Sequence, residues 1–345
     1  MSDSENDKVE WKDPAGKYWS ELSDKYSDEP SAKSWEFLVQ IYGWFKKNRA
    51  DYTDKEGNRP YKLIFRGQGW YGDLKTSIER AFDEFEIYGN DRRDREKQLI
   101  RSFQRKAPYH LKGVGVPAPN KTLEWLSLMQ HHEAPTRLLD WTYSFYIALY
   151  NAVSKETEKA ESRGQYKCEL WVMDTEWFTR KTEGRQEPPE EGKLRGSIEG
   201  MPQENPNRSV LLDALNAADK EREDYKGDLA NNRSKLVQYL MDLGDPLPLV
   251  YNVTPIGLNE RIIYQQGTFV LPGDITKCFM QNLEPYRKDN CKEHLYRIVI
   301  RLEQQERNRI IDKLNDMNIN EAVLFPGLDG FARSLRMQLA FLHKR

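Results

Sequence analysis

The sequence predicts an α+β fold with a mixed or antiparallel central sheet flanked by helices. Helical and strand-like segments follow one another at irregular intervals along the 345 residues, whereas a doubly wound α/β sheet needs regular alternation. Neither a GxGxxG nor a Walker sequence is present, so the usual phosphate loops of such sheets are missing. Apolar residues make up 38% and aromatic residues 12% of the chain, which is enough for a packed core.

The helices are predicted from apolar periodicity. After a polar tail over residues 1–30, Trp35, Leu38, Ile41 and Phe45 recur at spacings of three and four and so form one apolar face. The 121–131 helix must end before Pro135, which lacks an N–H and disfavours helix at the residue before it. Further helices are expected over residues 74–84, 92–106, 144–153, 304–316 and 330–343.

Short apolar runs predict the strands, which are expected over residues 61–66, 169–174, 248–253, 261–271 and 294–303. Residues 180–245 are expected to form a charged insertion. Within it, residues 181–207 are rich in Gly, Pro and charge and predict a long surface loop, whereas residues 209–243 predict one or two exposed helices.

Composition excludes several classes of protein. The net charge is -2, from 53 basic and 55 acidic residues, so no global field attracts nucleic acid or anionic lipid. No apolar run reaches the roughly 18 residues that span a bilayer. Cys168, Cys278 and Cys291 are odd in number and widely spaced, which favours a reducing, cytoplasmic compartment. The five His residues show no HExxH spacing and CxxC is absent, so no metal site is expected.

The run Phe65-Arg66-Gly67-Gln68 closes a predicted strand. Arg66 can bind a phosphate or carboxylate through two parallel hydrogen bonds, and Gly67 lets the backbone come close to a ligand. The alternative is an Arg paired with a structural Asp.

The segment from Gln130 to Thr142 gathers His131, His132, Arg137 and Asp140. Adjacent helix residues do not share a face, so at most one His points into a given pocket. Asp140 could orient Arg66 or Arg137 through an ion pair. Trp141 could stack on a purine or nicotinamide ring. The alternatives are a capping or core His, internal pairing of the charges, and a Trp that belongs to the core.

In the predicted strand over residues 261–271, Arg261 and Gln265 share a face, and Gln265-Gln266-Gly267 stands near the centre. Gly inside a strand often marks close approach by a ligand, or a bulge in the sheet.

The run from Phe325 to Gly330 has the composition of a turn, and its expected role is structural.

Together these segments resemble the FRG domain, a bacterial and phage family named for its Phe-Arg-Gly motif. The resemblance extends from about residue 31 to 342, outside the 180–245 insertion. The matching segments include Phe65-Arg66-Gly67-Gln68, the run Trp125 to Thr142, Arg261 to Phe269 and the Phe325 to Gly330 turn. The family usually has Gly where Glu133 stands.

A remoter likeness links the chain to ADP-ribosyltransferases, in which an aromatic-Arg-Gly at the end of the first core strand holds NAD. It implies an ADP-ribosyltransferase-like fold and an NAD-binding effector, an ADP-ribosyltransferase or NAD glycohydrolase, acting in phage defence or conflict. The third motif of those enzymes supplies a Glu, where this chain has Gln265 and Gln266. A Gln cannot act as a general base, and Glu260 and Glu321 are the nearby carboxylates that could take its place.

The resemblance implies roles for particular residues. His131, His132, Asp140 and Gln265 are expected to serve the chemistry, with a His binding ribose or moving a proton. NAD is expected to contact Arg66, Gly67, Gln68, Arg137, Trp141, Thr142, Arg261 and Phe269. The alternative function is a non-catalytic module that binds a nucleotide or nucleic acid, with a protein or nucleic acid as target.

Overall fold

The computed structural model describes residues 33–50, 63–70, 72–111, 115–154, 165–183, 193–217, 226–255, 260–289 and 294–341. Its centre is an open six-stranded sheet in the order β4-β5-β2-β1-β3-β6, in which every neighbouring pair is antiparallel. The predicted α+β class with an antiparallel sheet is therefore confirmed. The strands are β1 (Leu63–Gln68), β2 (Leu139–Thr142), β3 (Gln165–Asp174), β4 (Val250–Val253), β5 (Gly267–Pro272) and β6 (Leu295–Glu303).

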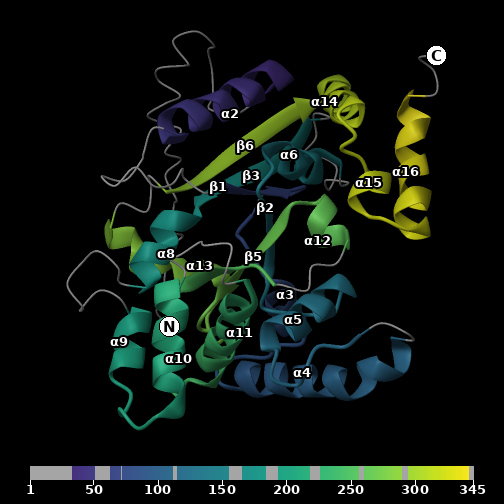
Figure 1. The fold of residues 1–345 in the computed structure, drawn as a ribbon. Helices are drawn as coiled ribbons and strands as arrows, with labels where there is room; N and C mark the ends of the chain where they lie inside the picture. Colours follow the sequence, from purple (N-terminus) through teal and green to yellow (C-terminus); the bar gives the residue numbers. More distant parts are fainter. Residues whose placement is uncertain are drawn as a thin grey trace, which may run out of the picture.

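Helices cover both faces of the sheet (Figure 1). The helices expected over residues 74–84, 92–106, 121–131, 144–153 and 330–343 begin within three residues of those positions, and the helix expected over residues 304–316 spans those residues. The helices are α2 (Trp35–Ala50), α3 (Ser77–Glu84), α4 (Asp91–His110), α5 (Thr122–His131), α6 (Phe145–Ser154), α8 (Thr175–Glu183), α9 (Lys193–Glu199), α10 (Pro206–Ala217), α11 (Lys226–Asp242), α12 (Glu260–Tyr264), α13 (Phe279–Leu283), α14 (Gln304–Asp316), α15 (Glu321–Leu324) and α16 (Leu328–Phe341), with a 3₁₀ turn over Glu284–Asp289. The helices α8, α13 and α15 were not predicted.

Two hydrophobic cores lie on opposite faces of the sheet, because successive strand residues point to opposite sides. On β3, Leu170 and Val172 join the core made with α2, α6 and α14, whereas Trp171 and Met173 join the core made with α5, α8 and α11.

Among the described residues, no helix has the length and apolar character needed to cross a bilayer. The predicted tail over residues 1–30 lies outside the described residues.

Gly67 packs β1 directly against α6. A Cβ at this position would lie 1.8 Å from the carbonyl oxygen of Ala148 and 2.6 Å from the backbone nitrogen of Ala152. The close backbone approach expected at Gly67 therefore exists, but its partner is a helix of the same chain. The buried small residues Ala148 and Ala152 are what make this approach possible.

The strand expected over residues 261–271 is wrong in its first half. Glu260–Tyr264 forms the helical turn α12, closed by a hydrogen bond from the Gln265 N–H to the Arg261 carbonyl at 3.0 Å. Gln266 then adopts a left-handed φ of 47°, which reverses the chain so that β5 starts at Gly267. A helical turn and a strand both place positions four apart on one side, so Arg261 and Gln265 share a side in either case.

The insertion is also more integrated than expected. The predicted surface loop over residues 181–207 contains α9, and α11 is not an exposed helix. Ser234, Leu236, Val237 and Leu240 of α11 are buried, and the Ser234 hydroxyl accepts a hydrogen bond from the Leu123 N–H of α5 at 3.1 Å. An apolar stripe of α11 belongs to the core on one side of the sheet, which the high local charge concealed.

Candidate functional site

A hollow opens where α5, β2, α12 and β5 meet. Counted out to its open mouth, and so including solvent beyond the walls, it holds about 350 Å³ of space. Six of the predicted site residues line it, together with five others. The lining residues are Ser127, Gln130, His131, Asp140, Trp141, Arg261, Ile262, Gln265, Gly267, Thr268 and Phe269.

Two nitrogens in the wall of this hollow have no hydrogen-bond partner. They are Nδ1 of His131 and Nε1 of Trp141, and both atoms are buried. Burial lowers the pKa of His131, and the positive charges of His132 and Arg261 lower it further. The imidazole is therefore neutral at pH 7. Since buried polar groups are normally paired, these two unpaired nitrogens mark the hollow as a place for a polar ligand.

Arg261 supplies the positive charge of the hollow. Its guanidinium carbon lies 4.7 Å from the centre of the Phe325 ring, and among the described residues no carboxylate pairs with it. Arg333 of α16 also approaches this ring, at 5.2 Å, but it pairs with Glu321 at 2.9 Å and does not line the hollow. The stacking on Phe325 fixes the position of Arg261 and leaves its N–H groups available for an anion.

Asp140 and Gln265 are held in place by specific hydrogen bonds. Oδ2 of Asp140 accepts a hydrogen bond from Nε2 of Gln130 at 2.9 Å. Nε2 of Gln265 donates to the Leu324 carbonyl at 3.0 Å, so its Oε1 is the atom left for a ligand. Asp140 is exposed and is the one carboxylate among the lining residues.

Arg66 lies beside the hollow without lining it. Its Nη1 donates to the main-chain carbonyl of Asp140 at 2.6 Å, and its Nε is buried without a partner. Burial lowers the pKa of this guanidinium to about 10, with Asp140 raising it and Arg80 lowering it. Gln68, also on β1, is buried and donates to the Gly72 carbonyl at 3.2 Å. Arg66 thus contacts the backbone of Asp140, and the expected Arg66–Asp140 carboxylate pair is not formed.

Arg137 does not line the hollow, although it was expected to contact a ligand. It is fully buried, and its Nε donates to Oε1 of Glu96 at 2.7 Å while Nη2 pairs with the other carboxylate oxygen. Nη1 donates to the carbonyls of Pro272 and Gly273. Internal pairing, the alternative interpretation, describes Arg137 correctly, but its partner is Glu96 on α4 and not Asp140. Four of its five N–H donors are thus used inside the protein.

Three other predicted residues also lie outside the lining. The Thr142 hydroxyl donates to the Gln265 carbonyl at 2.7 Å and accepts from the Ser144 N–H at 3.0 Å, so it ties β2 to the turn after α12. His132 is exposed and contacts His131 edge to face, with ring centres 4.9 Å apart. Gly67 packs on α6. These contacts show that Thr142 and Gly67 have structural roles.

The sequence prediction missed Ser127, Gln130, Ile262, Gly267 and Thr268 as lining residues. A signal for the first two was present, since positions 127, 130 and 131 have the i, i+3, i+4 spacing of one helix face. Ile262 could not be found while α12 and β5 were taken as one strand, because alternation along a strand places it on the face opposite Arg261.

Comparisons with known proteins identify one domain. The family model of the FRG domain matches residues 61–161, a span that contains β1, α3, α4, α5, β2 and α6. No significant match was found among curated proteins or among solved structures. Glu133, which stands where the family usually has Gly, has a left-handed φ of 61°, the conformation that Gly adopts without strain. The chain therefore contains an FRG domain over residues 61–161.

Proposed function

We propose that the hollow binds a nucleotide of the NAD class and that the chain acts on it as an ADP-ribosyltransferase or NAD glycohydrolase. One observation carries the proposal. The unpaired nitrogens belong to His131 and Trp141, two residues that line the same small space as the unpaired charge of Arg261. The Trp141 N–H and the Arg261 guanidinium are donors, and Nδ1 of His131 is a third donor in one of the two neutral tautomers. This lining favours a ligand rich in acceptor oxygens, such as a phosphorylated ribose.

The lining fits part of such a ligand. Arg261 would bind a phosphate, Oε1 of Gln265 would accept from a ribose hydroxyl, and Trp141 with Phe269 would supply an apolar wall for a ring. The enclosed part of the hollow is small, so it would hold one end of the ligand. The rest of a dinucleotide would extend through the open mouth. Arg66, behind Asp140, would add positive charge near the ligand.

Asp140 is the residue best placed to support cleavage of a glycosidic bond. Such cleavage develops positive charge on the ribose, which a carboxylate stabilises. The two carboxylates that could replace the missing Glu do not line the hollow. Glu260 is exposed on α12, and Glu321 is engaged by Arg333 and by the Tyr150 hydroxyl.

The test separates binding from chemistry. We expect calorimetry to detect binding of NAD to the chain. We also expect the chain to release nicotinamide from NAD over hours. Arg261→Gln should lower affinity at least 10-fold, since charged hydrogen bonds are worth about 1.5–3 kcal/mol. Arg333→Gln is the matched control, because it removes an Arg from the same Phe325 ring but none from the hollow, and should leave affinity unchanged. Asp140→Asn should bind NAD and release no nicotinamide.

Each result decides between the functions. Binding without release in the unmodified chain would support the non-catalytic nucleotide-binding module and overturn the enzymatic part of the proposal. Absence of NAD binding, or equal losses in Arg261→Gln and Arg333→Gln, would overturn the site itself.

The proposed setting is the bacterial cytoplasm, in phage defence. Free thiols support a reducing compartment: Cys168 is buried and Cys278 half-buried, and neither forms a disulfide. Cells expressing the chain should resist phage infection, and those expressing Asp140→Asn at the same level should not. Equal plaque counts in both would reject this role.

A further inference from the structure

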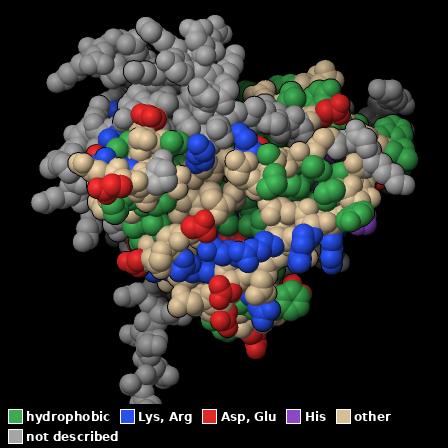
Figure 2. Space-filling view, turned by 60° about the horizontal axis from the view of Figure 1, so that its bottom comes forward, with side chains coloured by type: hydrophobic (Ala, Val, Ile, Leu, Met, Phe, Trp, Pro, Cys, Tyr) green, Lys and Arg blue, Asp and Glu red, His purple; other side chains and the backbone are tan. Residues whose placement is uncertain are grey.

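A row of basic side chains winds along α4 and turns by about 40° around the helix axis at each step of four residues. Arg93, Lys97, Arg101 and Arg105 follow one another at intervals of four, and Tyr109 continues the row. Four residues of helix advance about 6 Å, so the row is about 24 Å long. Figure 2, which brings the α4 end of the molecule forward, shows a line of Lys and Arg side chains across this face.

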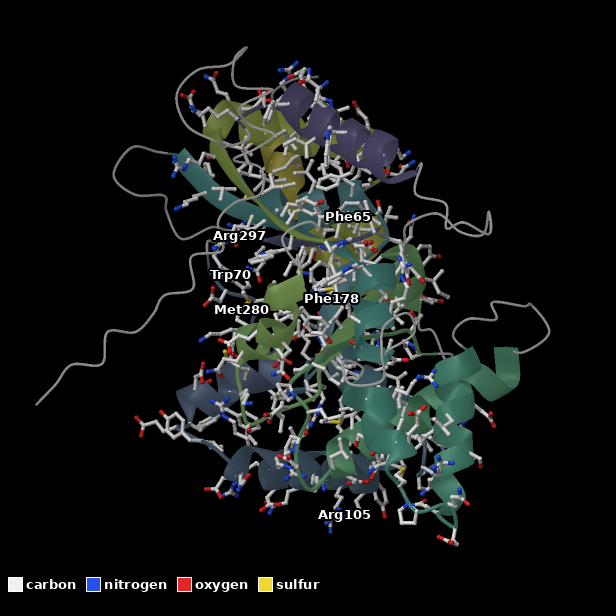
Figure 3. The ribbon with its side chains drawn as sticks, turned by 90° about the vertical axis from the view of Figure 1, so that its left-hand side faces the viewer. Phe65, Trp70, Arg105, Phe178, Met280 and Arg297 are labelled. Carbon is white, nitrogen blue, oxygen red and sulfur yellow. The ribbon has the colours of Figure 1, made fainter. Side chains whose placement is uncertain are left out.

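The second half of this row is not neutralised by the protein. Arg93 donates to the carbonyls of Leu243 and Gly244, and Lys97 pairs with Asp242 at 3.0 Å. Arg101, Arg105 and the neighbouring Lys106 are exposed and form no ion pair with any described residue. Figure 3 shows Arg105 pointing away from the body of the protein.

No acidic residue counters these charges along the helix. Residues 97–110 contain Lys97, Arg101, Arg105 and Lys106 and no Asp or Glu. Glu96, the last acidic residue before them, is buried against Arg137. The chain as a whole has a net charge of -2, so this basic half-helix is a local concentration of positive charge and not a reflection of composition.

Tyr109 adds an aromatic face at the end of the row. Its exposed fraction is 82%, which is unusual for a ring that could be packed against the helix. Exposed rings beside a line of cations are the arrangement that binds single strands, in which each base presents a face for stacking. A duplex hides those faces, and an acidic peptide has none.

We propose that the exposed end of α4 is a docking surface for single-stranded nucleic acid, which passes around the helix. Arg101 and Arg105 bind phosphates on one side, Lys106 binds a phosphate on the adjoining side, and Tyr109 stacks on a base. Polyanion binding by this surface does not depend on the hollow, because none of these four residues lines it. The inference therefore goes beyond the proposed NAD site, and either can fail while the other stands.

Fluorescence anisotropy with labelled dT and rU oligonucleotides of about 16 nucleotides tests the surface in the full chain. Each phosphate neutralised on a single strand contributes about -0.7 to the slope of log K against log salt. Three contacts predict a slope of about -2, which is about a 20-fold loss of affinity for a fourfold rise in salt. Comparing the two oligonucleotides distinguishes DNA from RNA as the preferred strand.

Variants locate the binding. Arg101→Gln with Arg105→Gln should reduce the slope to about -0.7, and Tyr109→Ala should weaken binding about fivefold or more at constant slope. The matched control removes two exposed lysines at the other end of the molecule, Lys33→Gln with Lys46→Gln, and should change neither quantity. NAD affinity should be unchanged in all these variants.

Three outcomes would overturn the proposal. They are no binding of either oligonucleotide at low salt, equal effects of the α4 and control variants, and binding of a duplex or a poly-glutamate peptide as tight as that of the single strands. A circular dichroism spectrum of each variant excludes unfolding as the cause of a lost signal.

Discussion

Replacing Gly67 with Ala should destabilise the whole fold. The added Cβ would lie 1.8 Å from the Ala148 carbonyl oxygen, whereas ordinary contact begins at 3.4 Å, so α6 would have to move about 1.6 Å from β1. A gap of only 0.5–1 Å forfeits a quarter to a half of the dispersion energy across an interface. Seven residues of α6 are buried, so we expect a cost of about 3 kcal/mol or more, the upper end for overpacked cores.

Thermal unfolding followed by circular dichroism measures this cost. A loss of about 3 kcal/mol should lower the Tm by about 4 °C or more. The control is Gly43→Ala in the exposed part of α2, where a new Cβ meets nothing within 4 Å. There the same substitution should raise stability by up to about 1 kcal/mol. If Gly67→Ala melts at the parent temperature and instead loses NAD affinity, the packing explanation is wrong and Gly67 serves a ligand.

Three further predictions concern the surroundings of the hollow. Glu96→Gln leaves the buried guanidinium of Arg137 without its counter-charge and should cost about 3–5 kcal/mol in urea unfolding; a cost below 1 kcal/mol would show that the pair is dispensable. Burial lowers the pKa of His131 below 6.5 in the folded chain, so the unfolded chain takes up this proton at a higher pH than the folded chain does. The free energy of unfolding should therefore decrease as the pH is lowered from about 6.5. His131→Gln should flatten that part of the curve, and an unchanged curve would contradict the assigned burial. Glu133→Gly relieves a left-handed φ of 61° and should raise the free energy of unfolding by about 0.5–1 kcal/mol; a loss would mean that the Glu133 side chain makes a stabilising contact.

The fold class and most element positions could be predicted from periodicity alone. The 304–316 helix was predicted from the spacing that buries Ile310, Ile311 and Leu314. The segment around Arg261 could not, because a single helical turn has too few residues to show a period, and its boundary depends on the left-handed Gln266. Burial of α11 was hidden for a different reason, since a polar-rich helix can still present a narrow apolar stripe.

The candidate site was predictable to a similar degree. His131, Asp140 and Arg261 lie on one hollow, as their chemistry suggested. Arg137 did not differ from them in residue type or neighbours, yet it pairs with Glu96, 41 positions away. Local sequence does not identify a distant partner, so it cannot separate a buried structural cation from one that faces a ligand.

The pairing of the strands limits how the chain can be divided into fragments or transferred by recombination. The span matched by the FRG domain holds β1 and β2, which share a single pair of facing residues, Phe65 and Thr142. Their main partners are β3, with six facing pairs, and β5, with four, and both follow the matched span. A fragment limited to residues 61–161 would carry strands with bare edges on either side. Gene fusion or recombination could transfer a working unit only by moving the later strands along with the motif.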